Sequence, residues 1–444
     1  MKRLRAAAAG SIAALLLLLA APALGAAGTV LLVSQTLSEP GFIAEDGEPT
    51  ISADGRFVAY VGETPDREEI SSTGTGIYLR DMSGGTTPVD IPHGRSEQGI
   101  DFGAVAPSIS DSGRYLAFAS EDPDISSEDR NAETTPAGYT YPVRDIFVYD
   151  RSTGRTIFAS RADGPRGAAG NEDSNSPSIS ADGRYVAFST QATDFLHGVY
   201  GGVYVRDLRK KRTTLAGRAD GRRGEPLSAS NPSISANGRM VAFQTSVGHG
   251  HGHRTRKLEI GVRNMKTGRT VYASRASGHG ALADADCSVP AISADGRYVA
   301  FASKAKNLSP IDENSVEDVF VRDLQRNRTL LVSRSQGKRG APGGGDSSDP
   351  SISADGRYVA FDSYASNLGP SDNSTIPDVF VRDMRSGKVF LASRGTDGGP
   401  AANKASDAPA ISNDGRYVAF ASTATNLNPA DTQRQGSVFR YQLP

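Results

Sequence analysis

The stretch PSISADGRYVAF, Pro177–Phe188, decides the fold of this chain, because variants of it occur seven times. The copies begin at Pro49, Pro107, Pro177, Pro232, Pro290, Pro350 and Pro409. Successive copies lie 58, 70, 55, 58, 60 and 59 residues apart. A repeat this regular is typical of an array in which each copy is one supersecondary unit.

Each repeat is predicted to form four short antiparallel strands. The fifth repeat contains them as PAIS (290–293), YVAFAS (298–303), DVFVRD (318–323) and TLLVSRSQ (329–336). Asp-Gly in the first connection supplies the residues that a tight hairpin turn requires. The strands are apolar at successive positions, which is expected when neighbouring units cover both faces of a sheet. Small alanines at the centre of YVAF let adjacent units approach.

The two ends of the repeat array complement each other. The segment TVLLVSQT (29–36) closely copies the fourth strand of a repeat, and the last repeat ends after SVFRYQ (437–442) without that strand. We therefore expect residues 28–444 to form an all-β, seven-bladed propeller of four-stranded antiparallel blades. In this fold the N-terminal strand completes the last blade and closes the ring, which removes an open sheet edge.

The repeat resembles that of a known family. The pattern P-x-x-S-x-D-G-(R/K)-x-(V/I)-A-F, followed by a V-F-V-R-D strand, is similar to the propeller repeats of TolB and its relatives, which are akin to WD-repeat propellers. The resemblance covers about residues 29–443 and implies the same propeller architecture.

Residues 1–27 have the three regions of a cleavable signal peptide. A basic head precedes an apolar core around Ile12–Ala21, and small residues at Gly25 and Ala27 follow Pro22. This pattern predicts export, with a mature protein that is secreted or periplasmic. No later segment is apolar enough to span a membrane, so no membrane span is expected.

Charge and cysteine content argue against a nucleic-acid partner, an internal disulfide and a structural zinc site. The formal net charge is −1, and loss of the leader would make it more negative, so we expect no nucleic-acid partner. Cys287 is the single cysteine, which excludes an internal disulfide and does not fit a structural zinc site.

Internal repetition separates structural from functional positions. Residues that recur in most repeats, such as the Arg-Asp pairs at 206–207, 322–323 and 382–383, are expected to serve the blade. Strand order places the long connections at one face of the ring and the tight turns at the other. A binding site is therefore expected on the long-loop face, where the repeat is broken.

The loops of the fifth and sixth repeats contain a candidate calcium site. Asp312, Asn314 and Asp318 offer oxygen ligands within one loop, and Asp372 and Asp378 stand at corresponding positions in the sixth repeat. Calcium prefers such ligands, although the Gly and bidentate Glu of an EF-hand are missing. The alternative is an Asx-type turn in which these side chains bond their own backbone. The sequence requires no cofactor, and Ca²⁺ is the candidate at these loops.

Two other interruptions are candidate binding segments. His249, His251 and His253 alternate with glycine in the fourth repeat, a pattern that suits Zn²⁺ or Cu²⁺ or a solvated polar loop. The long loop of the second repeat, Glu121–Arg144, contains Tyr139 and Tyr141. Exposed tyrosines favour a lid that contacts a protein or glycan, and a surface insertion without a partner is the alternative.

Recognisable catalytic motifs are missing. The sequence contains no G-x-S-x-G nucleophile elbow and no H-E-x-x-H zinc motif. The preferred hypothesis is thus an exported, non-catalytic propeller that binds a protein or glycan partner through its long-loop face. The alternative is a secreted hydrolase or lyase with carboxylates at the central mouth.

Overall fold

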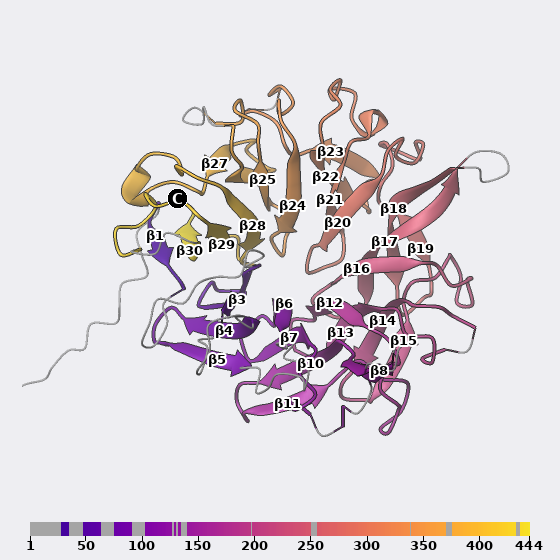
Figure 1. The fold of residues 1–444 in the computed structure, drawn as a ribbon. Helices are drawn as coiled ribbons and strands as arrows, with labels where there is room; N and C mark the ends of the chain where they lie inside the picture. Colours follow the sequence, from indigo (N-terminus) through magenta and orange to yellow (C-terminus); the bar gives the residue numbers. More distant parts are fainter. Residues whose placement is uncertain are drawn as a thin grey trace, which may run out of the picture.

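The computed structural model shows seven sheets arranged as a ring around a central axis (Figure 1). It describes residues 28–34, 48–63, 75–90, 103–126, 128–129, 132–134, 140–196, 198–249, 255–337, 339–369, 375–431 and 436–444. Each sheet has four antiparallel strands, and the first strand of each blade lies nearest the axis. Among the described residues, no helix has the length and apolar character that crossing a bilayer requires.

The first three blades follow the leader in chain order. Blade 1 contains β2 (Thr50–Ile51), β3 (Phe57–Glu63), β4 (Thr75–Asp81) and β5 (Thr86–Asp90). Blade 2 contains β6 (Ala104–Ile109), β7 (Tyr115–Ser120), β10 (Asp145–Asp150) and β11 (Arg155–Phe158). Blade 3 contains β12 (Ser174–Ile179), β13 (Tyr185–Thr190), β14 (Gly202–Asp207) and β15 (Arg212–Leu215). A separate hairpin in the long loop of blade 2 contains β8 (Ala132–Thr134) and β9 (Thr140–Pro142).

The remaining blades repeat this plan. Blade 4 contains β16 (Ala229–Ile234), β17 (Met240–His249), β18 (Thr255–Asn264) and β19 (Thr270–Tyr272). Blade 5 contains β20 (Cys287–Ile292), β21 (Tyr298–Ser303), β22 (Asp318–Asp323) and β23 (Arg328–Leu331). Blade 6 contains β24 (Ser347–Ile352), β25 (Tyr358–Ser363), β26 (Asp378–Asp383) and β27 (Val389–Leu391). Blade 7 contains β28 (Ser406–Ile411), β29 (Tyr417–Ser422), β30 (Ser437–Gln442) and β1 (Val30–Leu32). Two short 3-10 helices are η1 (Lys306–Leu308) and η2 (Thr396–Gly398).

The predicted closure of the ring is confirmed. Strand β1 pairs antiparallel with β30, with Val30 opposite Tyr441 and Leu32 opposite Phe439. The N-terminal strand therefore supplies the fourth strand of the last blade, as the match between TVLLVSQT and the fourth strands predicts.

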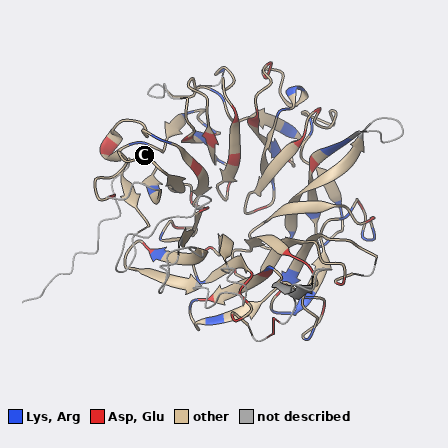
Figure 2. Ribbon diagram, viewed as in Figure 1, with Lys and Arg blue, Asp and Glu red and all other residues tan. Residues whose placement is uncertain are grey.

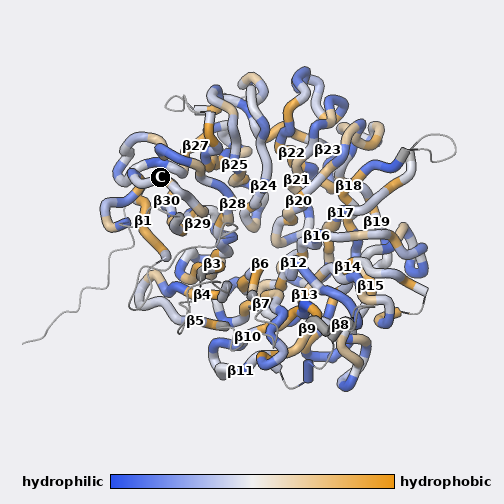
Figure 3. The backbone as a smooth tube through the Cα atoms, in the orientation of Figure 1, coloured by the Kyte–Doolittle hydropathy of each residue, from blue (hydrophilic) through white to orange (hydrophobic). Residues whose placement is uncertain are grey.

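The hydrophobic core is divided among the interfaces between blades. Seven clusters of buried side chains each join residues of two neighbouring blades, and one of them joins blade 7 to blade 1. The apolar residues follow the strands, whereas hydrophilic residues dominate the peripheral turns (Figure 3). The central alanines of YVAF are fully buried at these interfaces, at Ala187, Ala300, Ala360 and Ala419.

The first turn of each blade packs on the preceding blade. Gly183 has φ +72°, and a β-carbon there would lie 2.0 Å from the Tyr115 ring of blade 2. A β-carbon on Gly238 of blade 4 would likewise lie 2.2 Å from the ring of Tyr185 in blade 3. The glycine thus provides both a left-handed backbone and a flat surface for an aromatic ring.

Backbone hydrogen bonds link these turns into a closed circle. The N–H of Ala181 donates to the carbonyl of Ala236 at 3.1 Å, and Ala236 in turn donates to Ala294. Equivalent bonds join every other pair of neighbouring blades, and Asp414 N–H donates to Ala53 across the closing seam. Seven such bonds surround the axis.

An ion pair connects the two tight turns within five of the blades. Arg184 of the first turn donates Nε–H and Nη2–H to the two carboxylate oxygens of Asp207, at 3.0 and 2.7 Å. Asp207 also accepts the backbone N–H groups of Arg209 and Lys210, as its position at a strand end predicts. The corresponding pairs are Arg56–Asp81, Arg114–Asp150, Arg297–Asp323 and Arg357–Asp383.

The connections between blades differ from the expectation that all long loops share one face. After β11 the chain turns back along β15, the outer strand of the next blade. There the N–H of Gly164 donates to the carbonyl of Lys211, which lies in the tight turn between β14 and β15. Buried Arg206 holds this connection by donating to the carbonyls of Ala162 and Gly164. Arg263, Arg322 and Arg382 make the same contacts in later blades. The connection therefore covers an otherwise open sheet edge.

A pair of glycine substitutions separates backbone strain from contact between blades. Gly154 has φ +67° with open space around it, so Gly154→Ala should lower the free energy of unfolding by about 1–2 kcal/mol. Gly183→Ala adds a clash with Tyr115, so it should lower the free energy of unfolding by about 1–3 kcal/mol more than Gly154→Ala does. Urea unfolding followed by tyrosine fluorescence measures both, and equal losses would contradict the proposed role of the ring contact.

Candidate functional site

The long-loop face is the end of the ring where first strands begin, second strands end and third strands begin. At this end each first strand of blades 2 to 7 has a bulge directly before its proline. The residue at the bulge has φ between 46° and 52° at Ala106, Ser176, Asn231, Val289, Asp349 and Ala408. Such a backbone costs about 1–2 kcal/mol for a residue with a side chain. Bulges of this kind redirect side chains and are frequent beside functional sites.

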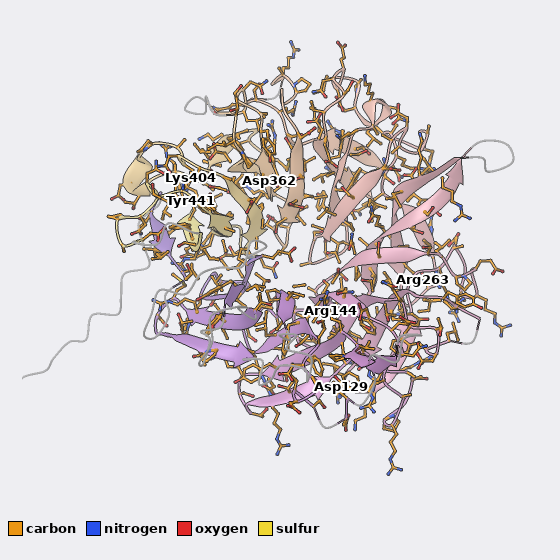
Figure 4. All side chains as sticks on the ribbon, viewed as in Figure 1. Asp129, Arg144, Arg263, Asp362, Lys404 and Tyr441 are labelled. Atoms are coloured by element: carbon orange, nitrogen blue, oxygen red, sulfur yellow. The ribbon has the colours of Figure 1, made fainter. Side chains whose placement is uncertain are left out.

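An acidic group lies among the inner strands of blades 6 and 7. The Asp362 carboxylate is buried and accepts the Ser348 hydroxyl at 3.2 and 3.3 Å (Figure 4). Burial above all, together with the charges of Asp349 and Asp407, raises the pKa of Asp362 to about 7. Three other blades have alanine at this position, at Ala119, Ala302 and Ala421, and the remaining three have Val61, Ser189 and Gln244.

A buried carboxyl–serine contact recurs at the start of the third strands. In blade 5 the Ser333 hydroxyl donates to Asp318 at 2.5 Å and accepts the N–H of Val319 at 2.9 Å. The same contact joins Asp145 to Ser160, Glu259 to Ser274 and Asp378 to Ser393. Two of the predicted calcium ligands, Asp318 and Asp378, therefore belong to a repeated contact within the blade.

The blade 5 loop nevertheless retains oxygen atoms without protein partners. Asp312 and Asp318 are buried, and Oδ1 of the first and Oδ2 of the second make no hydrogen bond. Asn314 forms the Asx turn of the alternative interpretation, since its Oδ1 accepts Val316 N–H at 3.1 Å. Within the described residues, no group of three or more His, Cys, Asp or Glu is placed to hold a metal. Calcium binding here stays a prediction that needs backbone carbonyls as further ligands.

Several predicted site residues lie outside the described residues. Asp372, His251, His253 and Tyr139 belong to this group. His249 is the last residue of β17 and pairs with Thr255, and Tyr141 lies in β9 opposite Glu133. The metal and lid hypotheses for these segments stay predictions.

Blade 3 is the one blade among blades 2 to 6 that lacks the carboxyl–serine contact. Gly202 occupies the carboxyl position and Gly217 the serine position, so both partners have been replaced together. A pocket of about 380 Å³ opens at this point between blades 3 and 4. Its lining includes the start of β12, the end of β13 and the start of β16, which places it on the long-loop face.

The pocket is polar and has an exposed aromatic ring at its edge. Tyr200 is 85 % exposed, and Gly201 and Gly202, with φ of 69° and 136°, follow it. Hydroxyl, amide and carboxylate groups line the remainder, from Asp173, Asn175, Ser189, Thr190, Gln191, Ser228 and Ser230. Sequence reasoning missed Tyr200, although the Gly-Gly pair that replaces an acidic residue was a readable signal.

Comparison with solved structures agrees with the fold. The propeller domain of the trilobed protease from Pyrococcus furiosus, described as having an open velcro topology, has a TM-score of 0.51 and 12 % identity over 90 % of this chain and 95 % of its own. A prolyl endopeptidase has a TM-score of 0.50 and 13 % identity, over 91 % of this chain and 50 % of its own. The structure of putative TolB from Agrobacterium tumefaciens has a TM-score of 0.41 and 15 % identity, over 81 % of this chain and 94 % of its own.

The likenesses to the trilobed protease domain and the prolyl endopeptidase concern the propeller fold alone, because the sequence identities are low. No family model matches the sequence, and no match to a curated protein was found.

The buried carboxyl of Asp362 predicts a specific pH dependence of stability. Its pKa in the folded state, about 7, exceeds the value of about 3.9 in an unfolded chain. The native state therefore retains a proton that the unfolded state has lost, and stability falls as pH rises from about 4 to about 7. Asp362→Asn should be more stable than the wild type at pH 8, with a difference that shrinks towards pH 5. Thermal melting across this range measures it.

The control for this measurement is Asp397→Asn, which removes an exposed carboxyl from η2. It should leave the pH dependence of the melting temperature unchanged. A wild-type slope that persists in Asp362→Asn would contradict the assignment.

The calcium hypothesis has its own test. At about a hundredfold excess over the dissociation constant, Ca²⁺ should add about 2.7 kcal/mol to the free energy of unfolding. Asp312→Asn should remove this gain, since it neutralises one of the two carboxylates with an unpartnered oxygen. Identical melting curves in Ca²⁺ and in chelator would contradict the hypothesis.

Proposed function

We propose that this chain is an exported, non-catalytic propeller that binds neutral glycans in the pocket between blades 3 and 4. The observation that carries the proposal is Tyr200, an exposed ring beside a polar pocket where the blade repeat is broken. A rigid frame with a decorated loop face is the usual basis of recognition.

The chemistry of the pocket suits a sugar. A sugar ring has an apolar C–H face and a rim of hydroxyl groups, so it stacks on a flat aromatic ring and exchanges hydrogen bonds with polar side chains. Asp173 is the one ionisable group of the lining besides Tyr200, and it already accepts the Arg144 N–H at 2.9 Å. The lining contains one carboxylate and no cationic side chain, and its other polar groups are uncharged, which favours a neutral ligand.

Export is part of the same proposal. The basic head, apolar core and small residues of segment 1–27 are those of a signal peptide. A mature protein in the periplasm or outside the cell would meet the glycans of the cell envelope or of the surroundings. A protein partner at the same face is the broader form of this hypothesis.

A hydrolase or lyase is the second candidate function. The observation that favours it is Asp362, whose pKa of about 7 suits a general acid at neutral pH, with Asp349 near it. Its burial argues against contact with a large substrate. Turnover of a glycan or lactone by the wild type, lost in Asp362→Asn, would replace the binding proposal.

The glycan proposal predicts a selective effect of Tyr200. Tyr200→Ala removes the stacking surface, so affinity for a glycan retained by the wild type should fall by about tenfold or more, or about 1.4 kcal/mol. Binding to immobilised neutral oligosaccharides, followed by calorimetry with the best of them, measures it.

Tyr364→Ala is the matched control. Tyr364 is 51 % exposed and follows the second strand of blade 6, outside the pocket. Its loss should leave glycan affinity unchanged. The proposal fails if the wild type retains no glycan, or if both variants lose affinity equally.

A further inference from the structure

The tight-turn face has a second interruption of the repeat, in blade 4. In five blades the arginine of the first turn pairs with an aspartate of the second turn. The same arginine also lies over the following aromatic ring, as Arg184 does over Tyr185 at 4.7 Å. Each arginine is thus held by a carboxylate and by a ring.

Blade 4 has lost all the partners of its arginine. Asn237 replaces the turn aspartate, Asn264 replaces the pairing aspartate, and Met240 replaces the aromatic residue. Arg239 is exposed, and its guanidinium makes no hydrogen bond, ion pair or ring contact with any described residue. Amides of nearly the same shape as aspartate keep the turn geometry, since Asn264 still accepts the N–H groups of Lys266 and Thr267 at 3.0 Å.

Arg239, which lacks these partners, lines a pocket between blades 3 and 4. This pocket has a volume of about 570 Å³ and also contains Lys210, Arg212 and Lys266 (Lys and Arg are blue in Figure 2). The two acids of its lining are already engaged. Asp207 pairs with Arg184, and Asp182 accepts the N–H of Arg184 and the hydroxyl of Ser180.

The lining of this pocket therefore has a surplus of positive charge. Four cationic side chains, Lys210, Arg212, Arg239 and Lys266, lack a carboxylate partner among the described residues. Apolar side chains complete the lining at Tyr185, Val205 and Met265.

We infer that this pocket binds a phosphate group, with Arg239 as its central ligand. A guanidinium fork matches two oxygens of a phosphate, and several cations favour a dianion over a carboxylate. The volume exceeds that of the phosphate group, and the apolar lining offers space for an attached organic portion. The source is either free phosphate or a small organic phosphate monoester. The site lies on the opposite face from the glycan pocket and does not depend on it.

Phosphate titration at constant ionic strength tests the inference on the full mature chain. Inorganic phosphate should bind the wild type measurably by calorimetry, and acetate should not. Arg239→Gln should weaken phosphate binding by about tenfold or more. Asn264→Asp restores the carboxylate that five other blades contain, so it should also weaken binding by at least about tenfold while the fold is preserved.

Arg297→Gln is the matched control, because it removes the arginine of the same turn in blade 5. It breaks the pair with Asp323 and should lower the melting temperature without changing phosphate affinity. A parallel titration with a sugar phosphate identifies the source, since tighter binding than inorganic phosphate assigns an organic ligand and equal binding assigns free phosphate. Unchanged affinity in Asn264→Asp, or equal binding of acetate and phosphate, would overturn the inference.

Discussion

The contact between an aromatic ring and a turn glycine is the constraint on which the rest of the ring depends. Tyr115 lies against Gly183, and Tyr185 lies against Gly238. An aromatic ring makes this contact at six of the seven turns, and Met240 takes its place against Gly296, so each blade is positioned by the one before it. Only a residue without a β-carbon fits, and only a left-handed backbone makes the turn tight enough. This geometry brings the turn backbones of neighbouring blades within hydrogen-bonding distance. It also places the arginine of the turn opposite the aspartate at the end of the third strand.

Both candidate binding pockets lie at the interface between blades 3 and 4, at opposite ends of it. On one face a carboxyl–serine contact has been replaced by Gly202 and Gly217, and on the other an Arg–Asp pair has been replaced by Arg239 with Asn264. In each case the substituted residues keep the backbone geometry of the blade. A repeat protein can therefore acquire a site without losing its frame, because the contacts that hold neighbouring blades together are distributed among many residues.

Much of the fold could be predicted because each copy of the repeat corresponds to one four-stranded blade. The seven copies, the missing fourth strand of the last repeat and its match at Thr29–Thr36 identified the closed ring. The partner of Asp207 could not be predicted, since Arg184 approaches it across two different turns. The course of the connection between blades also escaped prediction, because it depends on buried Arg206 binding carbonyls of the preceding loop. The candidate calcium residues are a similar case. Asp318 reads as a loop ligand, yet Ser333, fifteen residues later, is its nearest partner.

The circle of backbone hydrogen bonds has an electrostatic consequence. In an α-helix the peptide dipoles add along the axis and leave partial charges at the two ends. Here the bonds from Ala53 round to Asp414 follow one another around the axis and return to their starting point. Dipoles arranged tangentially around a closed circle cancel, so these seven bonds create no positive or negative pole along the channel. These seven bonds therefore add no field along the axis that a side-chain substitution would have to overcome.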